Sequence, residues 1–213
     1  MKILILGAHG KIAKLVREKL SETSDSSNLI RLFLRDANRI QNIRKNEEVM
    51  EGDAANFDDL VKALVDVDFV YANLAGKNIE DQAKNIVKAM DAANKKRLVW
   101  ISTLGIYDEV PGEFGKWNHQ MLDGGYLETY AAAAEIIENS DLDYTIIRPA
   151  WLTNKDEVDF ELTQKGEPFK GTEVSRKSIA AFVTEIMQEP NKYIKQSLGI
   201  NKPNTAGKKP AWY

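Results

Sequence analysis

The chain opens with a short apolar run that passes directly into a glycine turn. Residues 2–6 read Lys-Ile-Leu-Ile-Leu, and Gly7, Gly10 and Ala13 follow before an amphipathic stretch. Such a run before a helical pattern is typical of a buried strand, and Gly7 permits the tight turn. Gly10 removes a side chain where backbone approaches a phosphate, and the first amides of the helix favour an anion. The junction predicts a strand–turn–helix unit that binds the pyrophosphate of a dinucleotide. An ordinary turn without a ligand is the alternative.

Apolar runs and helical patterns alternate along the rest of the chain. The expected strands are Ile3–Leu6, Leu29–Leu34, Glu48–Glu51, Phe69–Leu74, Leu98–Ser102 and Tyr144–Arg148. The expected helices are Lys11–Leu20, Asn38–Arg44, Phe57–Val65, Glu80–Ala93 and Leu127–Asn139, with a last one between a Ser175 cap and Pro190. Asn56 is expected to cap the helix that begins at Phe57. Strands that alternate with helices form crossover units, so the pattern predicts an α/β fold with a doubly wound parallel sheet.

Two stretches interrupt this alternation. Residues 108–125 are acidic and rich in turn formers, and residues 154–172 carry no clear period. In a doubly wound sheet such excursions lie beyond the carboxyl ends of the strands, where ligands bind, so both are expected to face the substrate. The length suits a single domain over residues 1–213. The tail from Asn201 is expected to form a strap over the surface, with Trp212 and Tyr213 docked on an apolar area.

Composition narrows the class of protein. The 213 residues carry a net charge of -3 with both signs interspersed, which favours neither nucleic acid nor an anionic membrane as partner. There are no cysteines and two histidines, so the sequence predicts neither disulfides nor a metal site. The first apolar run is too short for a secretory signal, and no stretch reaches the length of a membrane span. We therefore expect a cytoplasmic protein.

The residue that ends the second strand of a dinucleotide fold selects the nucleotide. An acidic residue there binds the free ribose 2′-hydroxyl, whereas arginine accommodates a 2′-phosphate. Arg35 occupies this position and Asp36 follows it, while Lys11 in the glycine turn adds a second cation. A guanidinium also matches phosphate geometry, so NADP is expected in preference to NAD. The alternative is that Arg35 merely pairs with Asp36 or with a helix carboxylate on the surface.

Ligand-compatible residues also follow the third and fourth strands. Gly52 and Asp53 come after the third, where the carboxylate can hold the adenine edge. Ala75 and Gly76 come after the fourth, and small residues there let the backbone pass close to the ribose and pyrophosphate. Together with the glycine turn and Arg35, these residues place ligand chemistry at the carboxyl ends of four successive strands.

These motifs, together with the stretch Asp143–Ala150 (Asp-Tyr-Thr-Ile-Ile-Arg-Pro-Ala), resemble those of an atypical short-chain dehydrogenase/reductase. More narrowly, the chain resembles the NmrA-like NAD(P)H-binding group that includes biliverdin and flavin reductase relatives, over nearly its whole length. The resemblance implies a Rossmann fold with strand order 3-2-1-4-5-6-7 and a small substrate-side extension at the C-terminus. It also implies cofactor contacts from Gly7, Gly10, Lys11, Ile12, Arg35, Asp53, Ala75, Gly76, Ser102 and Pro149.

The catalytic residues of short-chain reductases are matched only in part. That family uses a serine after the fifth strand and a tyrosine whose pKa is lowered by a lysine four residues later. Ser102 fits the serine position, and Tyr126 and Tyr130 are the candidate tyrosines, but the residues four positions later are Tyr130 and Ala134. Without a nearby cation a phenol titrates near 10 and is a poor proton relay.

Other side chains offer weaker signals near the same site. His119 can donate a proton near a nicotinamide, although a lone loop histidine is more often solvated. Trp117 and Trp151 can stack on a planar ligand, although large aromatic residues most often simply pack.

Two functions of different class fit this pattern. The first is an NADPH-dependent oxidoreductase whose small-molecule acceptor is planar, such as a flavin or quinone, because such acceptors take hydride without a strongly tuned acid. The second is a non-catalytic NADP-sensing regulator of the NmrA-like type, which would act on a protein partner. An isomerase or epimerase ranks last, because that chemistry also depends on a Tyr-Lys pair.

Overall fold

The computed structural model describes residues 1–22 and 28–213. Its main sheet has eight strands in the order β3-β2-β1-β4-β5-β6-β10-β8. The parallel strands are β1 (Lys2–Leu6), β2 (Leu29–Leu34), β3 (Glu47–Glu51), β4 (Phe69–Ala72), β5 (Arg97–Ile101), β6 (Asp143–Pro149) and β10 (Gln196–Asn201). The predicted parallel α/β architecture and the order of its first six strands are confirmed, and β10 takes the seventh place.

The eighth strand differs from the expected order. β8 (Glu161–Gln164) pairs antiparallel with β10 at the edge of the sheet. A separate two-stranded sheet joins β7 (Trp151–Thr153) to β9 (Glu173–Ser175) in parallel. Residues 154–172, expected as an irregular excursion, therefore contain the edge strand β8 and connect the two strands of this small sheet.

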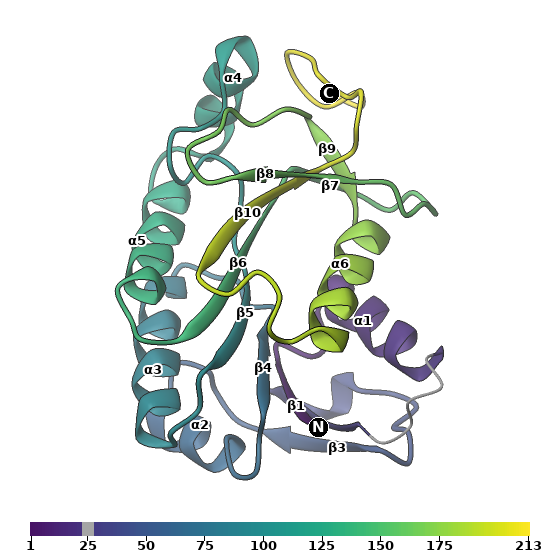
Figure 1. Cartoon of the computed structure of the whole chain (residues 1–213), viewed down its shortest axis with the longest axis vertical. Helices are drawn as coiled ribbons and strands as arrows, with labels where there is room; N and C mark the ends of the chain where they lie inside the picture. Colours follow the sequence, from purple (N-terminus) through teal and green to yellow (C-terminus); the bar gives the residue numbers. More distant parts are fainter. Residues whose placement is uncertain (23–27) are drawn as a thin grey trace.

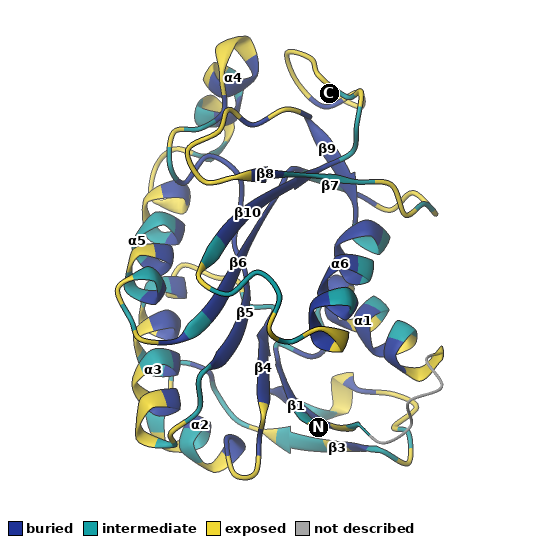
Figure 2. Ribbon diagram, viewed as in Figure 1, coloured by how far each residue is buried: buried dark blue, intermediate teal, exposed yellow. Residues whose placement is uncertain are grey.

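Helices cover both faces of the main sheet (Figure 1). The helices α1 (Lys11–Glu22) and α6 (Arg176–Gln188) pack on one face, and α2 (Phe57–Ala63), α3 (Ile79–Ala92) and α5 (Tyr126–Glu138) pack on the other. Side chains of β1 alternate between the two layers: Ile3 and Ile5 belong to the first core, Leu4 and Leu6 to the second. Figure 2 shows the burial of the central strands β1, β4, β5 and β6, which are buried except for their half-buried first residues Lys2 and Asp143. Burial on both faces explains why β1 reads as a continuous apolar run.

The predicted helix caps are present. Asn56 accepts a hydrogen bond from the backbone N–H of Asp59 at 3.1 Å, and Ser175 accepts one from Ser178 at 2.9 Å. The helix expected over 38–44 is instead one 3-10 turn, Ala37–Arg39, capped by Asp36. Residues 108–125, expected to be irregular, contain the helix α4 (Gly112–Leu122), in which Phe114 and Asn118 are buried at helical spacing.

The stretch that carries the family resemblance is held by a buried ion pair. Arg148 on β6 is fully buried, forms an ion pair with Glu109 and donates from Nε to Ser197 Oγ at 3.1 Å. Its guanidinium thus ties β6 to β10 and to the loop before α4. Among the residues that the structure describes, no helix combines the length and apolarity needed to span a membrane.

Candidate cofactor-binding cleft

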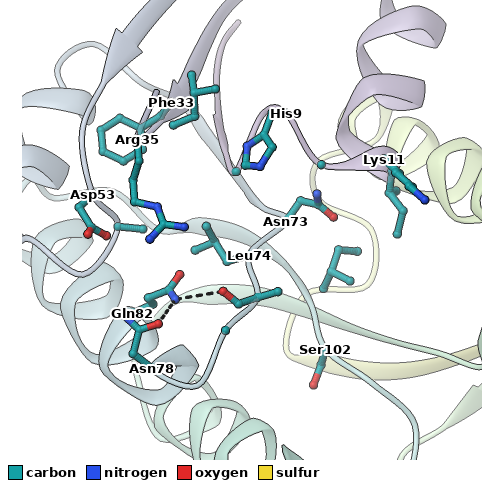
Figure 3. Close-up of a pocket in the computed structure, with 18 of the residues that line it drawn as sticks. His9, Lys11, Phe33, Arg35, Asp53, Asn73, Leu74, Asn78, Gln82 and Ser102 are labelled. Carbon is teal, nitrogen blue, oxygen red and sulfur yellow. Dashed lines mark hydrogen bonds between the residues drawn. The ribbon is translucent and has the colours of Figure 1, made fainter. Parts of the chain in front are cut away.

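A cleft of about 560 Å³ opens at the carboxyl ends of the parallel strands. Its walls come from the segments that follow β1, β2, β3, β4 and β5, with further residues from α5, β7 and α6. The lining residues are Gly7, His9, Gly10, Lys11, Ile12, Phe33, Leu34, Arg35, Gly52, Asp53, Ala54, Asn73, Leu74, Ala75, Gly76, Asn78, Gln82, Ile101, Ser102, Tyr126, Tyr130, Leu152 and Arg176. Figure 3 shows Arg35 and Asp53 at one end of this cleft and Ser102 at the other.

Gly7 is required by two independent constraints. Its φ of +72° lies in the left-handed region, and a Cβ there would come within 2.3 Å of the backbone oxygen of Asn73. A Cβ on Gly10 would lie 2.1 Å from the side-chain nitrogen of Asn73. From the sequence, the lack of a side chain at Gly10 is expected to let a phosphate approach the backbone. The structure adds a reason inside the protein, because the Asn73 amide fills that space.

The protonation of His9 is fixed by its neighbour. Nε2 of His9 lies 3.2 Å from the Arg39 guanidinium, and because a guanidinium only donates, Nε2 must accept. The proton of the neutral ring therefore resides on Nδ1, which is buried and has no partner within the described chain. Burial lowers the pKa of His9, and the charges of Arg39, Lys14 and Arg35 lower it further against an opposing effect of Asp36. The ring thus presents an unused N–H donor at the cleft.

Arg35 and Lys11 form no ion pair with any described residue. Asp36 accepts from Asn38 and lies 3.5 Å from Arg39, so it serves the 3-10 turn. Among the described residues Arg35 forms no ion pair with Asp36 or with a helix carboxylate, so the surface pairing offered as an alternative is not formed there. Arg35 and Lys11 are exposed at the lining of the cleft.

The segments after β3 and β4 are shaped by local hydrogen bonds. Asp53 accepts from the backbone N–H of Ala55 at 2.9 Å, which orders this turn. Gln82 on α3 donates to Asn78 at 2.8 Å and to the backbone oxygen of Ala75 at 3.4 Å (Figure 3). Gln82 thereby supports the loop that contains Ala75 and Gly76.

Ser102 and the two tyrosines lie together in the lining. The Ser102 hydroxyl is buried and has no partner in the described structure. The rings of Tyr126 and Tyr130 stack with centroids 4.5 Å apart, as their i, i+4 spacing on α5 allows. Tyr126 is 44% exposed whereas Tyr130 is 4% exposed. Burial raises the pKa of Tyr130, and neighbouring Tyr126 raises it further, against a hydrogen bond from the backbone of Gly76. Tyr130 is therefore held in its neutral form.

Several residues considered in the sequence lie outside the lining. Pro149 lies at the end of β6, where its carbonyl accepts from Leu104 at 3.1 Å. His119 stands on α4 rather than in a loop and contacts Asp123 at 2.8 Å and Asp108 at 3.1 Å. Trp117 and Trp151 pack on each other at 4.8 Å. Neither residues 108–125 nor residues 154–172 contribute to the lining, which takes the flanking Tyr126 and Leu152 instead.

Sequence reasoning missed the contributions of four side chains. These are the Nδ1 donor of His9, the supporting amide of Gln82, and the lining residues Leu152 and Arg176. His9 is visible inside the glycine motif, but the assignment of its unpaired donor to Nδ1 depends on Arg39, which is distant in sequence. Arg176 reaches the cleft only because the small β7/β9 sheet turns the chain back toward the main sheet.

The fold and the cleft define a Rossmann-type protein built to take a dinucleotide. A profile of the NAD(P)H-binding family matches residues 7–190, and the chain belongs to this family. It is 40% identical to a Rossmann-fold NAD(P)-binding family protein from Shigella flexneri, covering 98% of this chain and 97% of that one, with a TM-score of 0.85.

Two further relatives support the class. A wide-type short-chain dehydrogenase/reductase from Veillonella parvula, solved in complex with NADP, is 29% identical over 99% of this chain and 98% of its own, with a TM-score of 0.90. A UPF0659 protein from Saccharomyces cerevisiae is 28% identical over 96% of this chain and 94% of its own length. The predicted resemblance to the short-chain dehydrogenases/reductases is thereby confirmed, and the chain is an NAD(P)-binding protein of oxidoreductase type.

Proposed function

We propose that this protein is an NADPH-dependent reductase that transfers hydride to a planar acceptor of the flavin or quinone class. The observation that carries the proposal is a dinucleotide cleft whose hydroxyl-bearing end holds Ser102 and two tyrosines but no lysine at the i+4 position of either tyrosine. When bound, NADPH supplies the hydride and thus both electrons of the reduction.

The side chains present fit NADP. Two buried polar groups, His9 Nδ1–H and Ser102 Oγ, lack partners among the described residues, and both residues line the cleft. Buried polar groups are rarely left unpaired, so a ligand is expected to complete their hydrogen bonds. Arg35, with Lys11, would hold the 2′-phosphate, and the turn at Gly7 and Gly10 would hold the pyrophosphate. Asp53, Ala75, Gly76 and Ile12 would border the adenosine and ribose groups.

The state of the tyrosines favours a planar acceptor over a simple carbonyl. A carbonyl becomes an alkoxide as it takes hydride, and it needs an acid whose pKa is near the working pH. The raised pKa of Tyr130 makes it unsuited to that task. A flavin or quinone spreads the added charge over its rings, and solvent can supply its proton. Ser102 and the exposed Tyr126 would then orient the acceptor by hydrogen bonds.

The direct test is NADPH oxidation by the purified protein with a panel of flavins and quinones. We expect acceptor-dependent loss of NADPH absorbance and formation of the dihydro acceptor in equal amounts. Tight NADPH binding without turnover of any acceptor would contradict the proposal and favour the nucleotide-sensing regulator.

The tyrosines provide a second, quantitative test. Tyr126→Phe is expected to lower kcat/KM about tenfold at most, as for a lost positioning hydrogen bond, and Tyr130→Phe by no more. A true proton donor typically contributes about 10²–10⁴-fold. A loss of a thousandfold or more in either variant would therefore show that a tyrosine acts as the acid despite the missing lysine.

A further inference from the structure

Arg176 is a cation of the cleft that the cofactor assignment does not use. It is the first residue of α6, it lines the cleft, and it is only partly exposed. Its Nη1 donates to Asn154 Oδ1 at 2.7 Å, and no carboxylate pairs with it in the described parts of the chain. Partial burial lowers the pKa of this guanidinium, yet arginine stays charged near neutral pH. Its remaining N–H groups have no partner among the described residues and can bind a ligand.

Unlike Arg176, the neighbouring lysines have acidic partners. Lys155 pairs with Glu173 at 2.7 Å, and Lys177 pairs with Asp156 at 2.5 Å. Lys202 pairs with Glu157. The acids near the small sheet are thus matched to lysines, while the arginine that reaches the cleft has only a neutral amide.

The place of Arg176 in the fold separates it from the 2′-phosphate end. β7 and β9 run side by side with Leu152 opposite Val174 and Thr153 opposite Ser175, so Arg176 follows directly after that pairing. β7 itself continues from the end of β6. Arg35 follows β2, and the order β2-β1-β4-β5-β6 places three strands between β2 and β6. Arg176 therefore belongs to the substrate-side end of the cleft.

We propose that Arg176 binds an acidic group, a carboxylate or a phosphate, on the planar acceptor. This inference rests on the proposed function and adds to it the substrate class: planar acceptors that carry an anionic side chain. A guanidinium matches both anions by paired N–H donors, and partial burial strengthens such a bond relative to one in water. The amide of Asn154 fixes one edge of the guanidinium and leaves the rest to the ligand.

FMN and riboflavin provide the matched probes, because they share the same ring system and only FMN carries a phosphate. With NADPH, the wild-type protein is expected to show a kcat/KM at least about tenfold higher for FMN, the effect of one charge-assisted contact. Arg176→Gln should reduce this FMN-to-riboflavin ratio to about one, chiefly through the KM for FMN, and Arg176→Lys should restore part of it. Lys177→Gln removes the adjacent positive charge, which is outside the lining, and should keep the wild-type ratio.

Three outcomes would overturn the assignment. One is equal use of the two flavins by the wild-type protein, and another is a ratio that Arg176→Gln does not change. The third is a loss of NADPH binding in Arg176→Gln that is as large as its loss of FMN binding. That result would make Arg176 a ligand of a cofactor phosphate.

Equilibrium titration separates the failure of this inference from the failure of the proposed function. Flavin fluorescence quenching with NADP⁺ present measures binding when neither flavin is reduced. Tighter binding of FMN that is lost in Arg176→Gln would support the anion site even without turnover. Absence of FMN binding, or an unchanged preference, would overturn it.

Discussion

The His9 imidazole lies among cationic side chains at the turn that opens the cleft. Arg39 fixes its tautomer, and Lys14 and Arg35 also favour the neutral ring, so Nδ1–H remains as a donor. Composition alone gave no reason to single out this histidine. Its role depends on a side chain thirty positions away, and such a pairing is set by tertiary structure rather than by a local pattern.

The lowered pKa of His9 predicts a pH dependence. In the unfolded chain the ring titrates near its ordinary value of 6.5, whereas in the folded chain it takes up a proton only at lower pH. The free protein should therefore lose stability as pH falls below about 6.5. A bound phosphate would raise the pKa again, so NADP affinity should rise as pH falls toward 6.

Isothermal titrations at pH 7.5 and pH 6 with wild-type protein and His9→Ala measure this linkage. The variant should bind NADP about two- to tenfold more weakly at pH 7.5 and should lose the His9-dependent part of the pH effect. Unchanged affinity and an unchanged pH profile in His9→Ala would show that His9 does not contact the ligand.

At the scale of elements, the hydrophobic periodicity of the sequence correctly predicted the helices and strands that have a continuous apolar face. β1, α1, α3 and α5 have continuous apolar faces, and the caps at Asn56 and Ser175 follow from residue type. α4 was not predicted, because Gly112 and Gly115 break its pattern even though Phe114 packs inward. β10 and β8 are defined by pairing with each other and with β6, which no short window of sequence displays.

The glycine turn yields a prediction at this scale. Gly7→Ala places a Cβ against backbone and forces a positive φ on an L side chain, so it should destabilise the fold by about 1–2 kcal/mol for the dihedral alone, with the clash in addition. At Gly10 φ is not in the left-handed region, and the closest clash of an added Cβ, at 2.1 Å, is with the movable Asn73 amide, while the backbone oxygen of Gly7 lies at a tight 3.2 Å. Gly10→Ala should therefore fold with a smaller loss of stability while binding NADP less tightly.

Thermal unfolding of Gly7→Ala and Gly10→Ala tests the expectation that Gly7→Ala is the less stable protein, and nucleotide titration measures how each variant binds NADP. A Gly10→Ala protein less stable than Gly7→Ala would contradict the account of the turn.

At the scale of the whole molecule, the C-terminal tail packs against α4 and the small β7/β9 sheet. The ring of Tyr213 lies 4.9 Å from that of Trp117 and 5.4 Å from that of Trp151, so the predicted docking on an apolar area holds for one face of Tyr213. Trp212 contacts the Tyr213 ring instead, and both side chains remain about half exposed. The backbone N–H of Thr172 donates to the carbonyl of Thr205, and the backbone N–H of Ala211 donates to the carboxylate of Glu173, which holds the tail along β9. The partners of the tail are far away in sequence, so the sequence indicated docking but not its location.

Removing the Tyr213 ring should therefore lower stability. Tyr213→Ala loses two aromatic contacts worth about 0.5–1.5 kcal/mol each, which corresponds to a Tm decrease of several degrees, and should shift tryptophan emission to longer wavelength. Trp212→Ala is the matched control, because the two residues are almost equally exposed but the ring of Trp212 contacts, among the aromatic rings of the described residues, that of Tyr213 alone, at 6.1 Å. An equal or larger effect of Trp212→Ala would contradict this packing.

The central claim is that the cleft is built for NADP(H), with Arg35 as the residue that selects it. Calorimetric titration of wild-type protein and Arg35→Ala with NADP⁺ and NAD⁺ tests it most directly. The account predicts that wild-type protein binds NADP⁺ at least about tenfold more tightly than NAD⁺. Loss of one charge-assisted contact, about 1.5–3 kcal/mol, should weaken NADP⁺ binding to Arg35→Ala more than tenfold and leave NAD⁺ within about twofold. Equal affinities of the wild-type protein for the two nucleotides, or an equal loss of both in Arg35→Ala, would contradict it.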